Sequence, residues 1–182
     1  GKTILDPACG DGQFLVEAAK RIINLSIPSD LKNNLLNIYG WDIDEESINK
    51  CKSRLNYLIR KYDMNIKWNI KVFNPVLYNL SDENIKFDFI VGNPPYIRIQ
   101  NLEDTIRKSI KKNFTLCRNG STDIYIAFFE IAFTFLKKNG IGAFITPNSY
   151  FYNLAGKGLR EYLLKSGLLK KIINYTYHEL FE

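Results

Sequence analysis

Apolar and polar positions alternate along the chain in blocks that predict strands and helices in turn. Short apolar runs predict six strands, at residues 3–5, 37–43, 66–73, 87–91, 141–146 and 169–175. Between them, apolar residues recur at helical spacing, which predicts helices over residues 13–25, 45–59, 123–138 and 159–166. The repeated strand–helix–strand order predicts one α/β domain, with helices on both faces of a mainly parallel sheet.

Turn and cap residues predict where three of these helices begin or end. Asp44 is the expected N-cap of the helix that follows it, because its carboxylate can accept a backbone N–H of the first turn. Asn139 and Gly140 predict the end of the helix over residues 123–138, and Gly167 predicts the end of the last helix.

Residues 97–122 interrupt the pattern, and we expect weak regular structure there. Loops of this length in a compact domain are usually functional or mobile. The segment is basic, and its six cationic residues are Arg98, Arg107, Lys108, Lys111, Lys112 and Arg118. Two interpretations remain open, a solvated basic helix or a surface that contacts phosphate beside an active site.

Composition limits the class of protein. The chain has 182 residues, 46% of them hydrophobic and 24% charged, as in one soluble globular domain, and its start has no signal-peptide pattern. The formal net charge of +6 reflects either a lysine-rich composition or attraction to a polyanion such as nucleic acid. Three separated cysteines and a single histidine argue against a zinc site and are typical of the reducing cytoplasm.

Unusual residues gather where predicted strands end. These segments are residues 6–12, 42–44, 74–75 and 93–96. Because ligands of open parallel sheets bind at the carboxyl ends of the strands, the agreement in position predicts a single site.

The first segment, Asp6-Pro7-Ala8-Cys9-Gly10-Asp11-Gly12, joins a strand to a helix. Its glycines allow a tight turn and a close approach of a ligand to the backbone. It matches neither the dinucleotide fingerprint nor the P-loop, and the acidic Asp6 suits a cationic group better than a phosphate. The alternative is a plain turn. We expect Cys9 to be a small packed residue beside it.

Asp42 follows the second predicted strand, where a carboxylate can accept both hydroxyls of a ribose, and Ile43 beside it can pack on an adenine. The alternative is that Asp42 or Asp44 serves only as a helix cap, with Asp44 the better candidate.

Asn93-Pro94-Pro95-Tyr96 is suited to hold a planar amine. Hydrogen bonds from the amine to the Asn93 side-chain oxygen and the Pro94 carbonyl would localise its lone pair, and Tyr96 would cover its ring. The alternative is a rigid turn that ends the strand.

The order of these two motifs, D-P-A-C-G-x-G before N-P-P-Y, resembles that of the adenine-N6 DNA methyltransferases of the gamma motif order, and more narrowly the Eco57I-like restriction-modification enzymes. The resemblance covers nearly the whole chain. It implies a Rossmann-like class I methyltransferase, a three-layer α/β/α sandwich truncated here at both ends. It also implies methyl transfer from S-adenosyl-L-methionine to N6 of an adenine flipped out of double-stranded DNA, in a restriction-modification or phage-defence system.

The resemblance assigns roles to individual residues. Asp6, Gly10 and Gly12 would surround the methionine part of the cofactor, and Ala8 in the same turn would also bind the cofactor. Asp42 would bind its ribose. The adenine pocket would be formed by Ile43, Asn74, Pro95 and Phe128. Asn74 stands where the family has an aspartate. An amide oxygen can still accept a hydrogen bond from the adenine amine. Phe128, in the pattern D-x-Y-x-x-F, is otherwise one more apolar residue of a core helix.

Asn93, Pro94 and Tyr96 are the implied catalytic residues. Tyr96 would also contact the substrate, together with Asn148, Lys157 and Arg160, the last two being equally well explained as helix surface.

The chain opens directly on a strand and ends about where the family continues into target recognition, so we expect a fragment with weak cofactor affinity and little sequence-specific activity alone. Its expected partners are double-stranded DNA and a fused or separate restriction endonuclease and specificity domain, with no membrane involved. Two alternatives remain: a methyltransferase for a glutamine amide or an RNA base, and a non-catalytic DNA-binding or specificity module.

Overall fold

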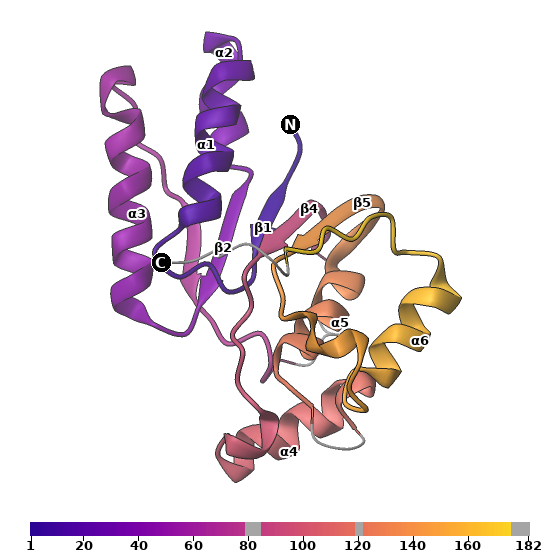
Figure 1. Cartoon of the computed structure of the whole chain (residues 1–182). Helices are drawn as coiled ribbons and strands as arrows, with labels where there is room; N and C mark the ends of the chain where they lie inside the picture. The colour runs from indigo at the N-terminus through magenta and orange to yellow at the C-terminus, as the bar shows by residue number, and fades with distance from the viewer. Residues whose placement is uncertain (79–84, 119–121, 176–182) are drawn as a thin grey trace.

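A sheet of five parallel strands lies at the centre of the computed structural model, which describes residues 1–78, 85–118 and 122–175 (Figure 1). The strands are β1 (Ile4–Asp6), β2 (Ile38–Asp42), β3 (Asn69–Val72), β4 (Phe87–Gly92) and β5 (Leu136–Phe144). Their order is β3-β2-β1-β4-β5, and every neighbouring pair is parallel. The order reverses between β1 and β4, which is where ligands bind in open sheets of this kind.

Three helices cover one face of the sheet: α1 (Gln13–Leu25), α2 (Pro28–Leu35) and α3 (Glu45–Ile59). Leu15 of α1 and Leu55 of α3 are fully buried there against Ile38 of β2. The predicted cap is confirmed, since the Asp44 carboxylate accepts the backbone N–H of Ser47 at 2.9 Å. The short, largely polar α2 was not predicted, although its proline at the first helical position is a helix-start signal.

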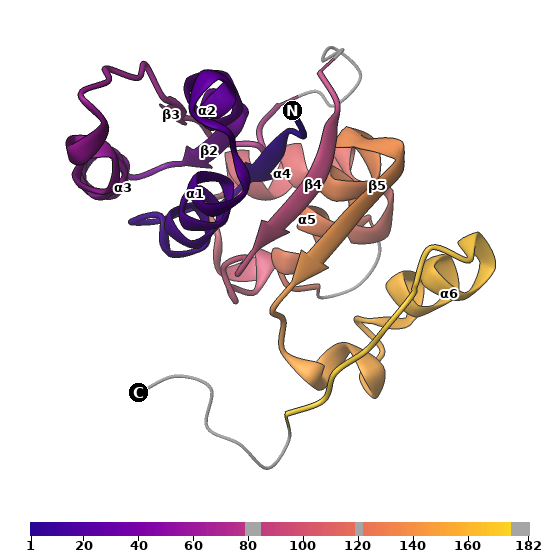
Figure 2. The same ribbon diagram turned by 90° about the horizontal axis from the view of Figure 1, so that it is seen from above.

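The opposite face is covered by α5 (Tyr125–Phe135), with α4 (Asp104–Asn113) beside it (Figure 2). The last helix, α6 (Lys157–Ser166), packs against α5, where the rings of Phe133 and Tyr162 stack with their centroids 4.7 Å apart. Its predicted end at Gly167 is confirmed by a left-handed φ of 63°. The prediction of a parallel sheet between two helical layers is therefore confirmed. Among the described residues, no helix is long and apolar enough to cross a membrane.

The predicted end of the helix over residues 123–138 is wrong. The helix stops at Phe135, and Leu136 already pairs with Phe87 of β4. Lys137 then forms an ion pair with Asp88 at 2.7 Å. The turn-forming Gly140 lies inside β5, where the register shifts, because pairing with β4 outweighs the local helix-stop signal.

The expectation of weak structure over residues 97–122 is also wrong for the described residues of that segment. Besides α4, it contains the short 3-10 turns η3 (Ile99–Asn101) and η4 (Thr115–Cys117). Ile110 and Phe114 are fully buried. The apolar face of α4 consists of only two isoleucines four positions apart, so its charges obscured it in the sequence.

Three predicted strands differ from the structure. The strand predicted over residues 141–146 is β5, which begins at Leu136 and ends at Phe144. The strand over residues 66–73 is confined to β3, although Ile66 and Trp68 before it are buried. Residues 169–175 form no strand, and Ile173 is 58% exposed. An added strand needs an apolar face to pack on as well as an edge to pair with, and on β5 the side chain of Ile141 is itself 61% exposed.

Candidate active site

The carboxylate of Asp6 stands at the carboxyl end of β1, next to the end of β4. It is 1% exposed and accepts the Ala8 backbone N–H at 3.1 Å. A Cβ atom at Gly92 would lie 2.9 Å from Asp6 Oδ1, so β4 can approach this closely only because position 92 is glycine. This contact places the turn after β1 beside the segment that begins with Asn93.

Burial raises the pKa of Asp6 to about 7, chiefly through desolvation of its charged form. The negative charge of Asp42 adds to the rise, and the hydrogen bond from Ala8 opposes it. A cation beside Asp6 would stabilise its carboxylate form, which suits the predicted role of this side chain.

The turn after β1 is a tight, glycine-dependent loop. The Gly12 N–H donates to the Cys9 carbonyl at 2.8 Å, and Cys9 is buried, as predicted for a packed residue. Gly12 has a φ of 87°, and a Cβ there would lie 2.3 Å from Cys51 Sγ. Gly10 also has a positive φ, of 50°, but nothing lies within 4 Å of its hypothetical Cβ. The space above Gly10 is thus open to a ligand.

The two glycines give a matched pair of substitutions. We expect Gly12→Ala to lower the free energy of unfolding by about 2–4 kcal/mol, because it combines backbone strain with overlap on Cys51. Gly10→Ala has only the left-handed strain and should lower it by about 1 kcal/mol. Chemical denaturation of both variants measures the difference, and equal losses would contradict this account of the turn.

Asp42 ties this turn to the loop after β2. Its carboxylate accepts the Gly10 N–H at 2.7 Å and the Asp44 N–H at 3.0 Å. Asp44, not Asp42, caps α3. Ile43, between them, is 67% exposed and so presents an apolar surface at the same edge.

The other residues predicted for the adenine pocket are placed differently. Asn74 follows β3 closely, and its side-chain oxygen accepts the Val76 N–H at 3.2 Å, which leaves one lone pair. Pro95 is exposed. Phe128 is 4% exposed and belongs to the core between α5 and the sheet.

Asn93 to Tyr96 leave the end of β4 as an extended segment. Pro94 is buried, whereas the Asn93 side chain is exposed. The Tyr96 hydroxyl makes a short hydrogen bond to the Asn93 side-chain oxygen and lies 3.3 Å from the Ile145 carbonyl. Tyr96 is 45% exposed, and partial burial raises the pKa of its hydroxyl. In this state the oxygen predicted to hold the amine already accepts one bond from Tyr96, which leaves one lone pair.

Tyr125 was missed as a residue of this site. Its ring meets that of Tyr96 edge-on, with centroids 6.3 Å apart and planes at 90°. Its hydroxyl is buried and, in the described part of the chain, has no partner with hydrogen-bond geometry, although nearby Ser149 partly offsets the rise in its pKa that burial causes. Its central place in the D-x-Y-x-x-F pattern was the available signal.

The residues predicted to contact substrate after β5 have different surroundings. Asn148 is exposed and begins the turn η5 (Asn148–Phe151). Arg160 donates to the Tyr150 carbonyl at 2.5 Å and the Asn153 carbonyl at 2.8 Å, so it braces that turn. Lys157 is exposed, with Glu161 3.9 Å away.

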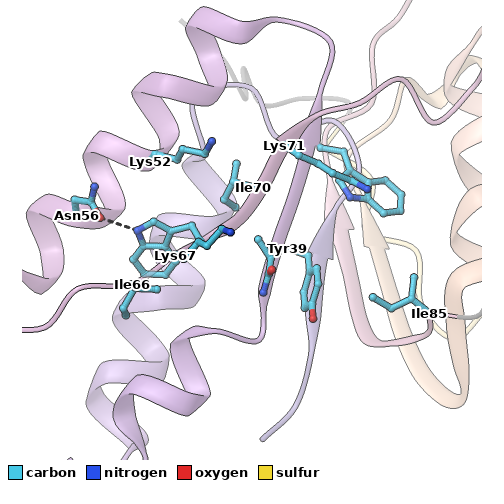
Figure 3. A pocket seen from close by; sticks show the side chains of 11 residues that line it. Tyr39, Lys52, Asn56, Ile66, Lys67, Ile70, Lys71 and Ile85 are labelled. Carbon is cyan, nitrogen blue, oxygen red and sulfur yellow. Dashed lines mark hydrogen bonds between the residues drawn. The ribbon is translucent and has the colours of Figure 1, made fainter.

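A cavity of about 550 Å³ lies away from these residues, at the β3 edge of the sheet (Figure 3). Lys52 and Lys67 line it, together with the Trp68 indole, which donates to Asn56 at 2.7 Å. It contains none of the predicted site residues, and the convergence of buried and hydrogen-bonded groups around Asp6 is the stronger indication of a site.

Known proteins resemble this chain in sequence and in fold. The type II methyltransferase M.BstVI of Geobacillus stearothermophilus is 28% identical over 193 residues, which cover 98% of this chain and 34% of that protein. The chain thus spans about a third of the length of this curated relative. A structure described as a class I S-adenosylmethionine-dependent methyltransferase of Listeria monocytogenes matches with a TM-score of 0.63 at 21% identity, over 90% of this chain and 45% of the other.

A third similar protein is the type ISP restriction-modification enzyme LlaGI, solved as a nuclease-deletion mutant with a DNA substrate mimic. It matches with a TM-score of 0.69 at 20% identity, over 90% of this chain and 19% of the other. The sequence profile of the Eco57I restriction-modification methylase family matches residues 16–181, most of the chain. The chain therefore belongs to the Eco57I restriction-modification methylase family.

Proposed function

We propose that this chain is the catalytic core that transfers a methyl group to N6 of an adenine in DNA, in a restriction-modification or phage-defence system. The observation that carries the proposal is the close approach of Gly92 to Asp6, which sets Asn93 beside the turn formed by Asp6 to Gly12. A cofactor held in that turn and an amine held by Asn93 would then be neighbours.

The family and the fold imply S-adenosyl-L-methionine as the cofactor. When bound, it supplies an electrophilic methyl group. The residues present fit it, since Gly10 leaves open space, Asp6 offers a buried acid to a cation, and Asp42 offers a partly exposed carboxylate to a ribose. Ala8, in the same turn, would also contact the cofactor. Ile43, Asn74 and Pro95 would surround the adenine, with Phe128 supporting that pocket from the core.

Asn93 and Pro94 would activate the amine. The N6 lone pair of adenine is delocalised into the ring, and donation of both N6 hydrogens, to the Asn93 side-chain oxygen and the Pro94 carbonyl, would localise it. The Asn93 oxygen accepts one bond from Tyr96 in this state and keeps a second lone pair for the amine, and Tyr96 would give up its bond in order to turn over the base. Tyr96, once released, would stack on the base. No strong general base is required, because the methylated amine is acidic and loses its proton readily.

A base inside a duplex cannot reach Asn93, so the target nucleotide must be flipped out of the helix. Asn148 and Lys157 would contact the displaced strand, and Arg160 would act by bracing the turn that carries Asn148. Recognition of the sequence and any cleavage would depend on a specificity domain and a restriction endonuclease, fused or separate.

The pKa of Asp6 predicts how cofactor affinity changes with pH. A bound cation favours the carboxylate and lowers that pKa, so the contribution of Asp6 is present above about pH 7 and is lost as the pH falls below it. Affinity for S-adenosyl-L-methionine should therefore be about tenfold lower at pH 6 than at pH 8. Calorimetric titration checks this, with Asp6→Asn as the control that should remove the difference. A difference of the same size in that variant would exclude Asp6 as its source.

The proposed substrate is tested by transfer of label from the cofactor to macromolecules. We expect the whole protein to label duplex DNA, and not RNA or protein. Label in RNA would favour the RNA-base alternative, and label in protein the glutamine amide. Binding of DNA without any labelling would favour a non-catalytic module.

A further inference from the structure

The basic segment after Tyr96 has no role in the mechanism above. Residues 97–122 contain six cationic and two acidic side chains, a net charge of +4 out of +6 for the whole chain. Most of the net positive charge is thus carried by a segment of 26 positions. This concentration calls for a local explanation, since a uniform composition bias would distribute the charge along the chain.

α4 carries part of this positive charge and is anchored to the core by buried side chains. Ile110, on one side, is fully buried, and Phe114 just after the helix is buried as well. Lys108, Lys111 and Lys112 are all exposed, and their spacing places them together on the side of the helix away from Ile110. The helix is therefore packed on the core by one side and exposes a basic face on the other.

Among the residues that the structure describes, no acidic side chain pairs with the charges of this face, which are those of Lys108, Lys111 and Lys112. By contrast, Lys20 of α1 and Lys50 of α3 each pair with a glutamate of their own helix. Lys111 and Lys112 lie in the last turn, where cations interact favourably with the helix dipole, but like charges three and four positions apart oppose this gain, so helix stability does not explain three unpaired lysines on one face.

The position of α4 relates this face to the candidate active site. Figure 1 shows α4 beyond the carboxyl ends of the strands, on the edge where β4 delivers Asn93 to Tyr96. The connection is short and fixed, because the Ile99 N–H donates to the Thr122 carbonyl at 2.9 Å and the Ile124 N–H to the Ile97 carbonyl at 2.8 Å. A polymer that has one unit at Asn93 and continues along this edge would pass α4.

We propose that the basic face of α4, formed by Lys108, Lys111 and Lys112, binds the sugar-phosphate backbone of DNA beside the flipped nucleotide. Side chains on neighbouring helical turns are spaced closely enough to neutralise successive phosphates of one strand. The contact is electrostatic and independent of sequence, so it would position the duplex while the recognition domain reads the bases. This inference rests on the proposed function.

The test uses the whole protein and a labelled DNA duplex, with binding followed by fluorescence anisotropy over a series of salt concentrations. The triple variant Lys108→Ala, Lys111→Ala, Lys112→Ala should bind roughly 10- to 100-fold more weakly at low salt. Its plot of log K against log salt should be less steep by about 2 to 3. Replacement of the same three residues by arginine should preserve both values.

The matched control is Lys32→Ala, Lys61→Ala, Lys67→Ala, which removes the same charge from exposed positions on α2, after α3 and before β3. It should change affinity less than threefold, and cofactor affinity should be unchanged in both triple variants. Equal weakening by the two sets, or none by either, would overturn the inference. Tighter, equally lysine-dependent binding of an RNA duplex would also overturn it. Labelling of DNA by the unmodified protein is the separate readout, and its failure would overturn the proposed function itself.

Discussion

Asn93→Ala is expected to lower methyl transfer to DNA by at least about 100-fold, with affinity for S-adenosyl-L-methionine changed less than twofold. The reason is that the Asn93 oxygen would act on the reacting amine only, and loss of one such pre-positioned group typically lowers kcat by about 100- to 1,000-fold. The rate under single-turnover conditions measures the chemical step, and calorimetric titration measures the cofactor affinity.

A suitable control is Asn101→Ala, which changes an exposed asparagine of η3 that is not part of the proposed site. It should retain the rate of the unmodified protein. Tyr96→Phe separates the contribution of the Tyr96 hydroxyl from that of its ring. It removes the hydroxyl that bonds to Asn93 in this state but keeps the ring that would cover the base. If Asn93→Ala methylates DNA at a normal rate, the assignment of the catalytic residue is wrong.

Asp42→Ala is expected to weaken the binding of S-adenosyl-L-methionine by about 100-fold. The substitution removes the acceptor for the Gly10 and Asp44 backbone N–H groups, at 2.7 and 3.0 Å, and also the proposed ribose contact. Hydrogen bonds to a charged group each contribute about 1.5–3 kcal/mol, so a loss of this size needs little more than one of them. Calorimetric titration near pH 8, where Asp6 is ionised, gives the dissociation constant.

Asp44→Ala is the matched control, because it removes a neighbouring carboxylate with a different task. That carboxylate caps α3, so its loss should lower the free energy of unfolding by about 1 kcal/mol and leave cofactor affinity nearly unchanged. An equal loss of affinity in both variants would mean that Asp42 acts only through the general integrity of the loop.

The fold could be predicted from the sequence wherever local signals and sheet pairing agreed. The limits of α1 matched the prediction, since Gly12 at its start and the apolar period within it favour the same helix. The local signal and the sheet pairing disagreed at Gly140, which is typical of the end of a helix but lies within β5. Partners distant in sequence, here the strand β4, decide such positions, and a linear pattern contains no information on them.

The candidate site was predictable in position rather than in detail. The ends of β1, β2 and β4 do meet, because parallel strands share one carboxyl edge. The bond from Tyr96 to Asn93 and the burial of the Tyr125 hydroxyl depend on how β4, α5 and the loop after β5 pack together. The packing of α4 on the core could not be predicted for a related reason. Only two isoleucines anchor this helix, and its other positions are mostly polar.

The most direct test of the proposed function is to identify the methylated nucleoside. DNA treated with the whole protein and S-adenosyl-L-methionine would be digested to nucleosides, and these would be separated and identified by mass spectrometry. The proposed roles of Asn93 and Pro94 predict N6-methyldeoxyadenosine, formed at least about 100-fold more slowly when Asn93→Ala replaces the unmodified protein. Methylation of cytosine, or none on any base of DNA, would contradict the central claim.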